Sequence, residues 1–441
     1  MDSAERRESR LGVGAKFTMR TVGLNFCLVN MAAAPDPASQ SRVYAPVSAA
    51  SADGFTRSMC AMALFNAAKE EYAKVDPTAP DANEQRTACH RKHAKEALQF
   101  AIDNGGVYIK AAQFVASLQG GAGEAGVPRE YVEAFKPLTD RVPPRHYEAV
   151  ALVAQEELGQ PLTSLVESLD EWPVAAASLA QVHCAYLPAE GKLGRRKVAV
   201  KLQYPTLQEQ MASDFETLKM MATMIAPNGY DFGWIIDDIQ KYVTSELDFT
   251  REALNSRAAS DALASLAPSV LVPPVVSQLS TRRVMTTEFL DGLTRLDRPA
   301  ELRALQLEPL AIGVLVGTAF SQLPLEYGLV HGDPHAGNVY ARVRPPVPGA
   351  APSTTSPSVP QPQLVILDHG LYHRLSDTDR LAVCDLILAC ATPWPNRAEV
   401  LRLSGQFAGA LAPLFPALIS PAFAFATGLN VKQLRAAAEG R

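Results

Sequence analysis

The sequence predicts an α+β protein in which a small sheet-containing lobe precedes a mostly helical lobe. Three runs of β-branched and apolar residues are typical of strands: 197–204, 283–290 and 364–367. Apolar residues recur at helical spacing from Met211 to Ile225 and again from Ile235 to Ala253, which predicts two amphipathic helices. A further helix is expected around Lys110, so the extension that precedes the sheet should be helical.

The composition is that of a folded globular protein. With 441 residues, 47% of them hydrophobic and 20% charged, the chain has room for two or three cores. Its net charge is -5 and no block of Lys and Arg is long enough to bind a nucleic acid, so we exclude nucleic acid as a partner. The six cysteines form no C-x-x-C pair and are interpreted as reduced core thiols.

Changes in composition divide the chain into parts. Residues 1–50 are expected to be an organelle presequence or a disordered tail, because early arginines precede an Ala/Ser/Pro-rich stretch with almost no acid after Glu8. Later breaks are a polar junction, a proline-marked turn and a Pro/Ser-rich insert. We predict a helical extension at 51–170, an N-lobe at 171–292, and a C-lobe at 293–441 with the insert at 344–363.

One late segment is apolar enough to raise the question of a membrane. From Ser404 to Val431 the chain carries no charge, but Pro413, Pro416 and Pro421 would each break a single helix. We expect this segment to be buried core of the last lobe, with contact to a lipid or membrane surface as the alternative.

Two carboxylates and an amide stand where strands or tight loops are expected to end. Asp333 and Asn338 lie in His-Gly-Asp-Pro-His-Ala-Gly-Asn at 331–338, and Asp368 follows the apolar run 364–367. Their oxygens are the ligands that Mg²⁺ and a transferring phosphoryl group require. The spacing predicts that Asp333 orients a nucleophile, while Asn338 and Asp368 hold the metal against nucleotide phosphates.

A lysine and a glutamate are expected to form a buried ion pair. Lys201 ends the apolar run Val-Ala-Val, where a lysine can also reach solvent from a sheet edge. Glu246 falls on the apolar stripe of the second predicted helix, where an unpaired carboxylate would be costly. We therefore predict a pair between Lys201 and Glu246 that positions the lysine on nucleotide phosphates.

Two further segments are candidates for contact with a nucleotide. Small residues precede the lysine strand, and they let a backbone approach a phosphate closely, although an Ala run is more often the interior of a helix. They are Ala175, Ala176, Ala177 and Ser178. The segment from Glu288 through Leu290 to Gly292 suits a linker whose main chain hydrogen-bonds an adenine edge, or a plain strand-to-turn junction.

The helix expected around Lys110 places a cation and an amide among apolar residues. Lys110 shares a face with Val107 and Phe114, and Gln113 lies close to one turn away. A polar partner should meet these two side chains, with a solvent-facing lysine as the alternative.

Together these motifs resemble the UbiB/ADCK family of atypical kinases over roughly residues 95–410. The segments that carry the resemblance are 110–113, 175–183, 198–201, 246–249, 288–292, 331–338 and 368–372. Within the family, Asp-His-Gly-Leu-Tyr at 368–372 and Phe-Gly-Trp-Ile-Ile at 232–236 are similar to the ADCK branch, which is mitochondrial in animals and fungi.

The resemblance implies a protein-kinase-like two-lobe fold that binds ATP and Mg²⁺. It implies that Lys201 contacts the phosphates with Glu246 as its partner, that Asp333 occupies the catalytic-loop position, and that Asn338 and Asp368 bind Mg²⁺. It also implies that the helix carrying Lys110 and Gln113 caps the cleft where peptides would otherwise bind. The implied role is lipid or isoprenoid-quinone homeostasis in a mitochondrion, with a plastid as the alternative and with protein partners unknown.

The chain departs from the family pattern at two positions, and three other functions remain open. Ala112 and Ala336 stand where the family has glycine and proline, and Ala336 loosens a loop that proline would stiffen. The alternatives are a small-molecule kinase of the aminoglycoside or choline kinase type, a nucleotide-binding pseudokinase scaffold, and a metal hydrolase. The hydrolase would use His331, Asp333, His335 and Asp368.

Overall fold

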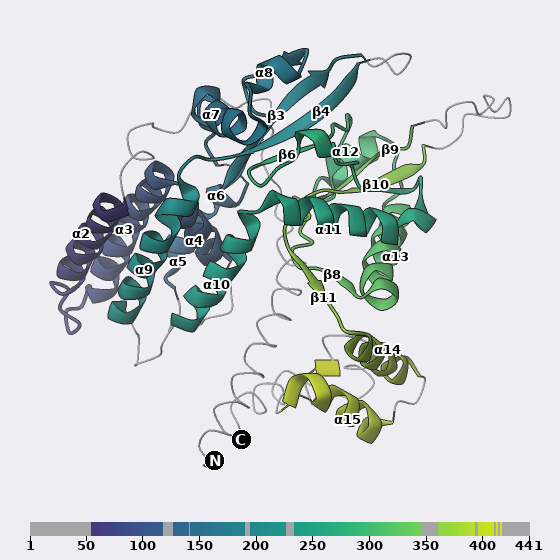
Figure 1. The fold of residues 1–441 in the computed structure, drawn as a ribbon. Coiled ribbons are helices and arrows are strands. Elements are labelled where there is room, and N and C mark those ends of the chain that lie inside the picture. Colours follow the sequence, from purple (N-terminus) through teal and green to yellow (C-terminus); the bar gives the residue numbers. More distant parts are fainter. Residues whose placement is uncertain are drawn as a thin grey trace, which may run out of the picture. The chain divides into compact units, whose positions relative to one another are not determined.

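The computed structural model describes most of the chain between residues 54 and 416. The described residues are 54–117, 127–140, 142–189, 195–225, 233–345, 360–392 and 396–409, with Ala412, Phe415 and Pro416. The segment predicted as a presequence, most of the predicted insert, Phe232 and nearly all of 410–431 lie outside them. Contacts divide the chain into an N-terminal unit, Ala34–Arg257 with Pro273–Asp291, and a C-terminal unit, Ala258–Val272 with Gly292–Arg441 and Met1–Ala33 (Figure 1).

The N-terminal unit opens with a group of helices. They are α2 (Gly54–Tyr72), α3 (Ala82–Asn104), α4 (Gly106–Ser117), α5 (Arg129–Phe135), α6 (Pro137–Asp140), α7 (Tyr147–Leu158) and α8 (Leu162–Leu165). Helix α4 contacts α3, α5 and α6, and its buried Tyr108 and Ala112 share a core with Phe135 and Leu138. Gly105 has φ 67 and turns the chain between α3 and α4, a conformation that favours glycine.

An antiparallel sheet follows these helices. Its strands are β1 (Ser168–Leu169), β2 (Ala175–Ala176), β3 (Ala180–Leu187), β4 (Arg196–Gln203) and β6 (Val284–Glu288). The order is β1-β3-β4-β6, with β2 also paired to β3. The strands predicted at 197–204 and 283–290 are therefore confirmed, and the register sets Lys201 between Val182 and Met285.

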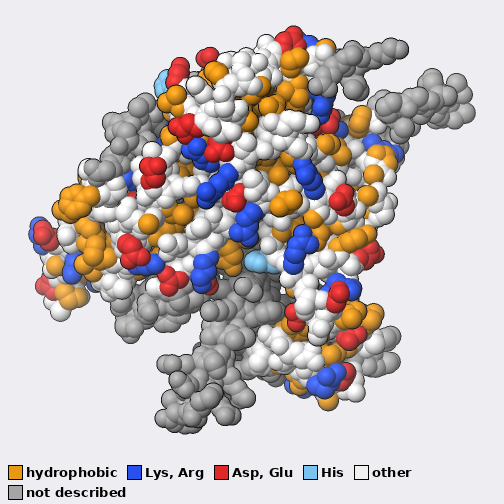
Figure 2. All heavy atoms as spheres, viewed as in Figure 1, with side chains coloured by type: hydrophobic (Ala, Val, Ile, Leu, Met, Phe, Trp, Pro, Cys, Tyr) orange, Lys and Arg blue, Asp and Glu red, His pale blue; other side chains and the backbone are white. Residues whose placement is uncertain are grey.

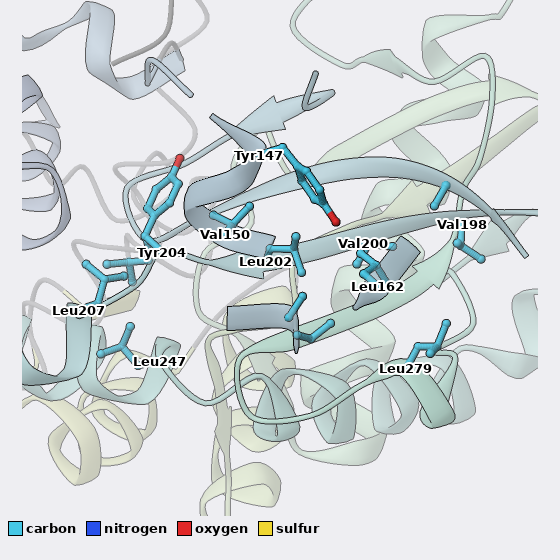
Figure 3. Packing of buried hydrophobic residues seen from close by; sticks show 14 of the residues in the cluster. Tyr147, Val150, Leu162, Val198, Val200, Leu202, Tyr204, Leu207, Leu247 and Leu279 are labelled. Carbon is cyan, nitrogen blue, oxygen red and sulfur yellow. The ribbon is translucent and has the colours of Figure 1, made fainter. Parts of the chain in front are cut away.

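Alternation along β4 gives the sheet two different faces. Val198, Val200 and Leu202 are fully buried and pack with Tyr147 of α7 and Leu162 of α8 (Figure 3). Since successive strand residues point to opposite faces, Lys197, Ala199 and Lys201 lie on the other side, where burial is only partial. The apolar run thus anchors the strand and leaves its lysine on the face away from this core.

The helices between β4 and β6 differ in one respect from the prediction. Helix α9 (Leu207–Ile225) is as expected, but the helix predicted from Ile235 to Ala253 is divided into α10 (Gly233–Glu246) and α11 (Phe249–Ala262). The carboxylate of Asp248 accepts hydrogen bonds from the backbone N–H and the hydroxyl of Thr250, at 3.1 and 2.6 Å. An aspartate here starts a new helix, because it satisfies a backbone donor that the first turn leaves unpaired.

The C-terminal unit carries two small sheets beside its helices. Its strands are β5 (Val270–Leu271), β7 (Thr294–Arg295), β8 (Leu329–His331), β9 (Val339–Val343), β10 (Pro362–Ile366) and β11 (Tyr372–Arg374). One sheet has the order β5-β10-β9-β7, and the other pairs β8 with β11. Strand β10 confirms the strand expected at 364–367, but it already begins at Pro362, inside the predicted insert.

The C-terminal unit also contains helices. They are α12 (Pro299–Ala304), α13 (Pro309–Tyr327), α14 (Asp377–Ala391) and α15 (Arg397–Ala408). Helix α13 buries Ala319 and Leu323 against Leu364 and Ile366 of β10. On the face that Figure 2 presents, acidic and basic side chains are interspersed.

Candidate active site

The loop between β8 and β9 is held by hydrogen bonds within itself and to the segment before β11. Gly332 donates its N–H to the carbonyl of Leu371 at 2.8 Å, which ties the start of the loop to the segment before β11. Asn338 is buried, and its amide nitrogen donates to the carbonyl of Asp333 at 3.2 Å. The nitrogen end of this amide is thus used inside the loop. The side chain of Asp333 is 47% exposed.

Asp368 lies at the end of β10, next to the start of β9. The strands are antiparallel, Ile366 pairs with Val339, and the N–H of Leu367 donates to the carbonyl of Asn338 at 2.8 Å. Asp368 has φ 57, and its carboxylate accepts the N–H of Gly370 at 3.1 Å. A left-handed backbone at a residue other than glycine is strained and often marks a functional site. The structure therefore holds the backbones of the two predicted metal ligands, Asn338 and Asp368, at neighbouring strand ends.

Two buried histidines support this loop. His331 is 4% exposed, and its Nδ1 accepts the N–H of Asp333 at 3.1 Å. Burial lowers the pKa of His331, although the charges of Asp368 and Asp333 act in the opposite direction. His369 contacts the hydroxyl of Tyr372 and the carbonyl of Ile366. Both rings therefore serve the loop conformation.

This role of the histidines speaks against the metal hydrolase. In the described part of the chain, no three or more His, Cys, Asp or Glu side chains are grouped so that they could hold a metal ion. The Nδ1 atom of His331 is also occupied by a backbone N–H. A carboxylate and amide pair of the kind found at Asp368 and Asn338 suits Mg²⁺, which usually keeps several waters and few protein ligands.

The prediction that Lys201 pairs with Glu246 is wrong. The Nζ atom of Lys201 lies 2.8 Å from both carboxylate oxygens of Glu252 and 4.9 Å from the ring centroid of Phe249. Glu252 stands in the first turn of α11 and is 6% exposed. The break at Asp248 starts a new helix, so the apolar stripe of α10 does not continue into α11 and cannot place Glu246 beside Lys201.

Glu246 pairs instead with Lys110. Its two carboxylate oxygens lie 2.8 and 2.9 Å from the Nζ atom, and the side chains are 24% and 29% exposed. The expectation that a polar partner meets Lys110 is therefore confirmed. Gln113 donates its amide N–H to the carbonyl of Leu138 in α6 at 2.9 Å, so this side chain links α4 to its neighbouring helix.

The alanine-rich segment forms a hairpin and not the interior of a helix. Ala175 and Ala176 form β2 and pair with Val182 and Gln181 of β3. The N–H of Ala177 donates to the carbonyl of Ala180 at 2.8 Å, which closes a tight turn around the buried Ser178. Since Val182 is also the register partner of Lys201, this hairpin lies beside the lysine strand.

The segment after β6 leads out of the N-terminal unit. Glu288 is the last residue of β6, and Phe289 donates its N–H to the carbonyl of Lys197 at 3.0 Å. Leu290 is buried, and the unit ends at Asp291, before Gly292 with φ 75. Pairing with β4 thus continues to Phe289, and the chain then turns into the second unit.

Sequence reasoning missed Glu252. The signal that could have found it is Asp248 directly before Phe249, because an aspartate immediately before an apolar residue is a start signal for a helix. A break at Asp248 places Glu252 in the first turn of a new helix, where it can point to a different neighbour from Glu246.

The N-terminal unit contains a sheet that carries Lys201, and the C-terminal unit contains a loop with Asp333 and Asn338 and an aspartate after a strand end. The model of the ABC1 atypical kinase-like domain matches residues 137–402. The chain belongs to this family, which confirms the resemblance to the UbiB/ADCK kinases. The class is therefore that of atypical kinase-like proteins with an α+β fold.

Curated relatives agree with this assignment. The chain is 32% identical over 340 residues to AarF domain-containing protein kinase 1 of Xenopus laevis, covering 76% of this chain and 60% of that protein. It is 33% identical over 305 residues to abkD of Dictyostelium discoideum, covering 69% and 41%. The chain thus spans about half the length of these relatives. The chain is also similar to a solved structure, that of the complex of Rv3197 with erythromycin from Mycobacterium tuberculosis. The TM-score is 0.44 and the sequence identity is 26%, and the match covers 74% of this chain and 75% of that one.

Proposed function

We propose that this protein binds Mg²⁺-ATP and acts as an atypical kinase or ATPase. The observation that carries the proposal is the hydrogen bond between Leu367 and Asn338, because it holds the backbones of a carboxylate and an amide residue at neighbouring strand ends. Oxygen ligands of these two types suit Mg²⁺ in phosphoryl transfer. The metal would neutralise charge on the phosphates.

Each unit would contribute its own residues to the reaction. In the C-terminal unit, Asn338 and Asp368 would hold the metal, and the half-exposed Asp333 would orient the attacking hydroxyl or water. In the N-terminal unit, Lys201 would contact the phosphates while Glu252 fixes its position. Glu246 would then act through Lys110 and not through Lys201.

Three segments of the N-terminal unit would complete the nucleotide contacts and limit access. The turn from Ala175 to Ser178 offers small residues and backbone N–H groups to phosphates. The main chain between Glu288 and Leu290 would meet the adenine edge. Helix α4, anchored by Lys110 and Gln113, would restrict peptide substrates, which favours ATP binding over phosphorylation of generic peptides.

The test of the site is a thermal shift measured with ATP, with and without Mg²⁺. A ligand at a hundred times its dissociation constant stabilises the folded state by about 2.7 kcal/mol, which is easily detected. Asp368→Asn should remove most of the Mg²⁺-dependent shift, because it removes one anionic ligand. Asp385→Asn, the same change at an exposed position of α14, is the control and should keep the shift. Equal Mg²⁺-ATP binding by Asp368→Asn and the parent would refute the site.

Turnover separates the enzyme from the pseudokinase alternative. The loop that carries Asp333 has Ala336 where the family has proline, and a looser loop orients a nucleophile less well. We expect slow release of phosphate from Mg²⁺-ATP that Asp333→Asn abolishes while binding persists. Binding with no release in the parent protein would identify a nucleotide-binding scaffold.

The proposed cellular role is lipid or isoprenoid-quinone homeostasis in a mitochondrion, with a plastid as the alternative. It is supported by family membership and by the early arginines of the acid-poor segment 1–50. A reporter fused to residues 1–50 should enter the organelle, and the same fusion with Arg6, Arg7 and Arg10 changed to glutamate should stay outside. A cytosolic parent fusion would remove the support for this location.

A further inference from the structure

Helix α2 contains an arginine with almost no exposed surface. Arg57 is 1% exposed, and so is its partner Asp214 in α9. The guanidinium donates to both carboxylate oxygens, from Nε at 3.1 Å and from Nη2 at 2.6 Å. A guanidinium fork binds a carboxylate in one orientation, so the pair fixes α2 against α9, which it contacts (Figure 1).

The guanidinium of Arg57 also holds the turn between α3 and α4. Its Nη1 donates to the carbonyl of Asn104, the last residue of α3, at 2.8 Å. Its Cζ lies 5.3 Å from the ring centroid of Tyr108, in the first turn of α4. The last carbonyls of a helix have no donor inside that helix, so a donor from outside fixes the place where α3 ends.

The turn itself consists of two glycines. Gly105 and Gly106 have φ 67 and 52, positive values that cost glycine no steric penalty. Glycine also has the widest choice of backbone conformations, so the two residues alone do not define the direction in which α4 leaves the turn. Arg57 contacts the chain on both sides of the turn and can therefore define that direction.

The two carboxylates that hold α4 lie between β4 and α11, the elements that carry Lys201 and its glutamate. Asp214 is in α9, the helix after β4, and Glu246 ends α10, the helix before α11. All of these elements belong to the N-terminal unit. Arg57 and Lys110 therefore fix α4 at two points to the segment that connects Lys201 with its partner.

The two points of attachment differ in burial. The side chains of Arg57 and Asp214 are 1% and 2% exposed, whereas those of Lys110 and Glu246 are 29% and 24% exposed. Replacing a buried ion pair by apolar residues of similar volume is often neutral or stabilising, so stability alone does not require charges at the buried point. A planar guanidinium does supply a fixed direction, which apolar contacts do not.

We propose that Arg57 is the positioning residue of the proposed cap, because it holds the first turn of α4 in the direction that brings Lys110 to Glu246. The proposal rests on the role proposed above for α4 at an ATP site. Arg57 acts through Lys110, which lies two residues after Tyr108. Loss of Arg57 lets α4 turn about the two glycines, so the contact between Lys110 and Glu246 opens and access to the site increases.

Amide hydrogen exchange of the full 441-residue chain tests the positioning without any turnover. Arg57→Lys keeps a cation for Asp214, but an ammonium lacks the planar fork that reaches this carboxylate and the carbonyl of Asn104 together. We expect exchange in α4 to rise about tenfold to a hundredfold, as for loss of a hydrogen bond to a charged group, while exchange in β4 stays unchanged. Arg283→Lys is the control, because this arginine pairs with two glutamates of α7 in the same unit, and it should leave α4 unchanged.

A second variant covers the case in which Arg57→Lys unfolds the helices. Arg57→Met together with Asp214→Leu removes both charges, so no buried charge is left without a partner. Neither new side chain can donate to the carbonyl of Asn104, so α4 should exchange faster in this variant as well. Unchanged exchange in α4 in both variants would overturn the proposal. An equal rise in α4 and β4 would also overturn it, because the pair would then support the whole unit.

Phosphoryl transfer shows whether Arg57 acts through Lys110. Arg57→Lys should raise phosphoryl transfer, including self-phosphorylation, several-fold, as expected for Lys110→Ala. In a chain that already carries Lys110→Ala it should add nothing, because the contact that it positions is gone. No increase with Arg57→Lys where Lys110→Ala gives one would contradict the proposal, and so would a full increase in the Lys110→Ala chain. Faster exchange in α4 of the variants, with no binding of Mg²⁺-ATP by the parent, would support the positioning and count against the ATP site alone.

Discussion

The sheet of the N-terminal unit and the helices that precede it each place one lysine against one glutamate, but the two pairs differ in burial. Lys201 meets Glu252, whose side chain is 7% exposed, whereas Lys110 meets Glu246, whose side chain is 24% exposed. Removing one partner of a buried pair leaves the other charge buried without compensation. At an exposed pair, water solvates the charge that remains. We infer that the first pair supports the folded sheet and that the second can open without unfolding the unit.

The largest expected effect is that of Lys201→Ala. The variant leaves the carboxylate of Glu252 almost completely buried without its lysine, so the free energy of unfolding should fall by about 3 kcal/mol. Urea denaturation measures the loss. In a double-mutant cycle, Lys201→Ala should couple to Glu252→Gln, and Glu246→Gln serves as the control that should not couple. Coupling of Lys201 to Glu246 with none to Glu252 would restore the pairing that the sequence suggested.

The sheet and the helices that precede it should also differ in how their stability depends on pH, because each contains a histidine and the two histidines differ in burial. His183 in β3 is fully buried, its Nδ1 lies 2.9 Å from the carbonyl of Asp170, and its Nε2 lies 2.9 Å from the amide nitrogen of Gln181. His90 in α3 is only partly buried and contacts the hydroxyl of Tyr72. Burial lowers the pKa of both histidines. The unfolded chain therefore binds protons at a higher pH than the folded chain does.

Stability should consequently fall as the pH drops below about 6.5, the ordinary pKa of histidine. Each fully buried histidine can contribute up to about 1.4 kcal/mol per pH unit in that window. Urea midpoints measured between pH 8 and pH 5 should show a slope that His183→Gln reduces more than His90→Gln. A larger change in slope with His90→Gln would mean that the sheet is not the more tightly buried region.

The smallest effect on stability is expected for Lys110→Ala. Because both partners of this pair reach solvent, the free energy of unfolding should change by less than about 1 kcal/mol. The effect on activity should be larger: loss of the anchor of α4 should raise phosphoryl transfer, including self-phosphorylation, or alter nucleotide preference. Lys69→Ala, at an exposed lysine of α2, is the matched control. Strong peptide phosphorylation by the parent, unchanged in Lys110→Ala, would show that the helix is only structural.

Short-range patterns in the sequence determined much of the fold and of the loop chemistry. The run of β-branched and apolar residues around Val198 and Val200 identified β4, and the apolar run before Asp368 identified β10, because such residues favour strands. Asp333 and Asn338 lie five residues apart, so the geometry of their loop is settled by local hydrogen bonds such as that from Asn338 to the carbonyl of Asp333. The family could be identified on the same basis, since its motifs are local.

Only the tertiary structure decided which side chains meet across the chain. A helix advances by about 100° per residue, so the break at Asp248 was enough to exchange Glu246 for Glu252 as the partner of Lys201. Gln113 donates a hydrogen bond to the carbonyl of Leu138, and no residue pattern predicts that this backbone group lies within its reach. The sequence could not predict the exposure of Val314 either, because an apolar helix has the same composition whether one of its faces is buried or exposed to solvent. Burial and long-range pairing depend on what packs beside each element, and that information exists only in the folded chain.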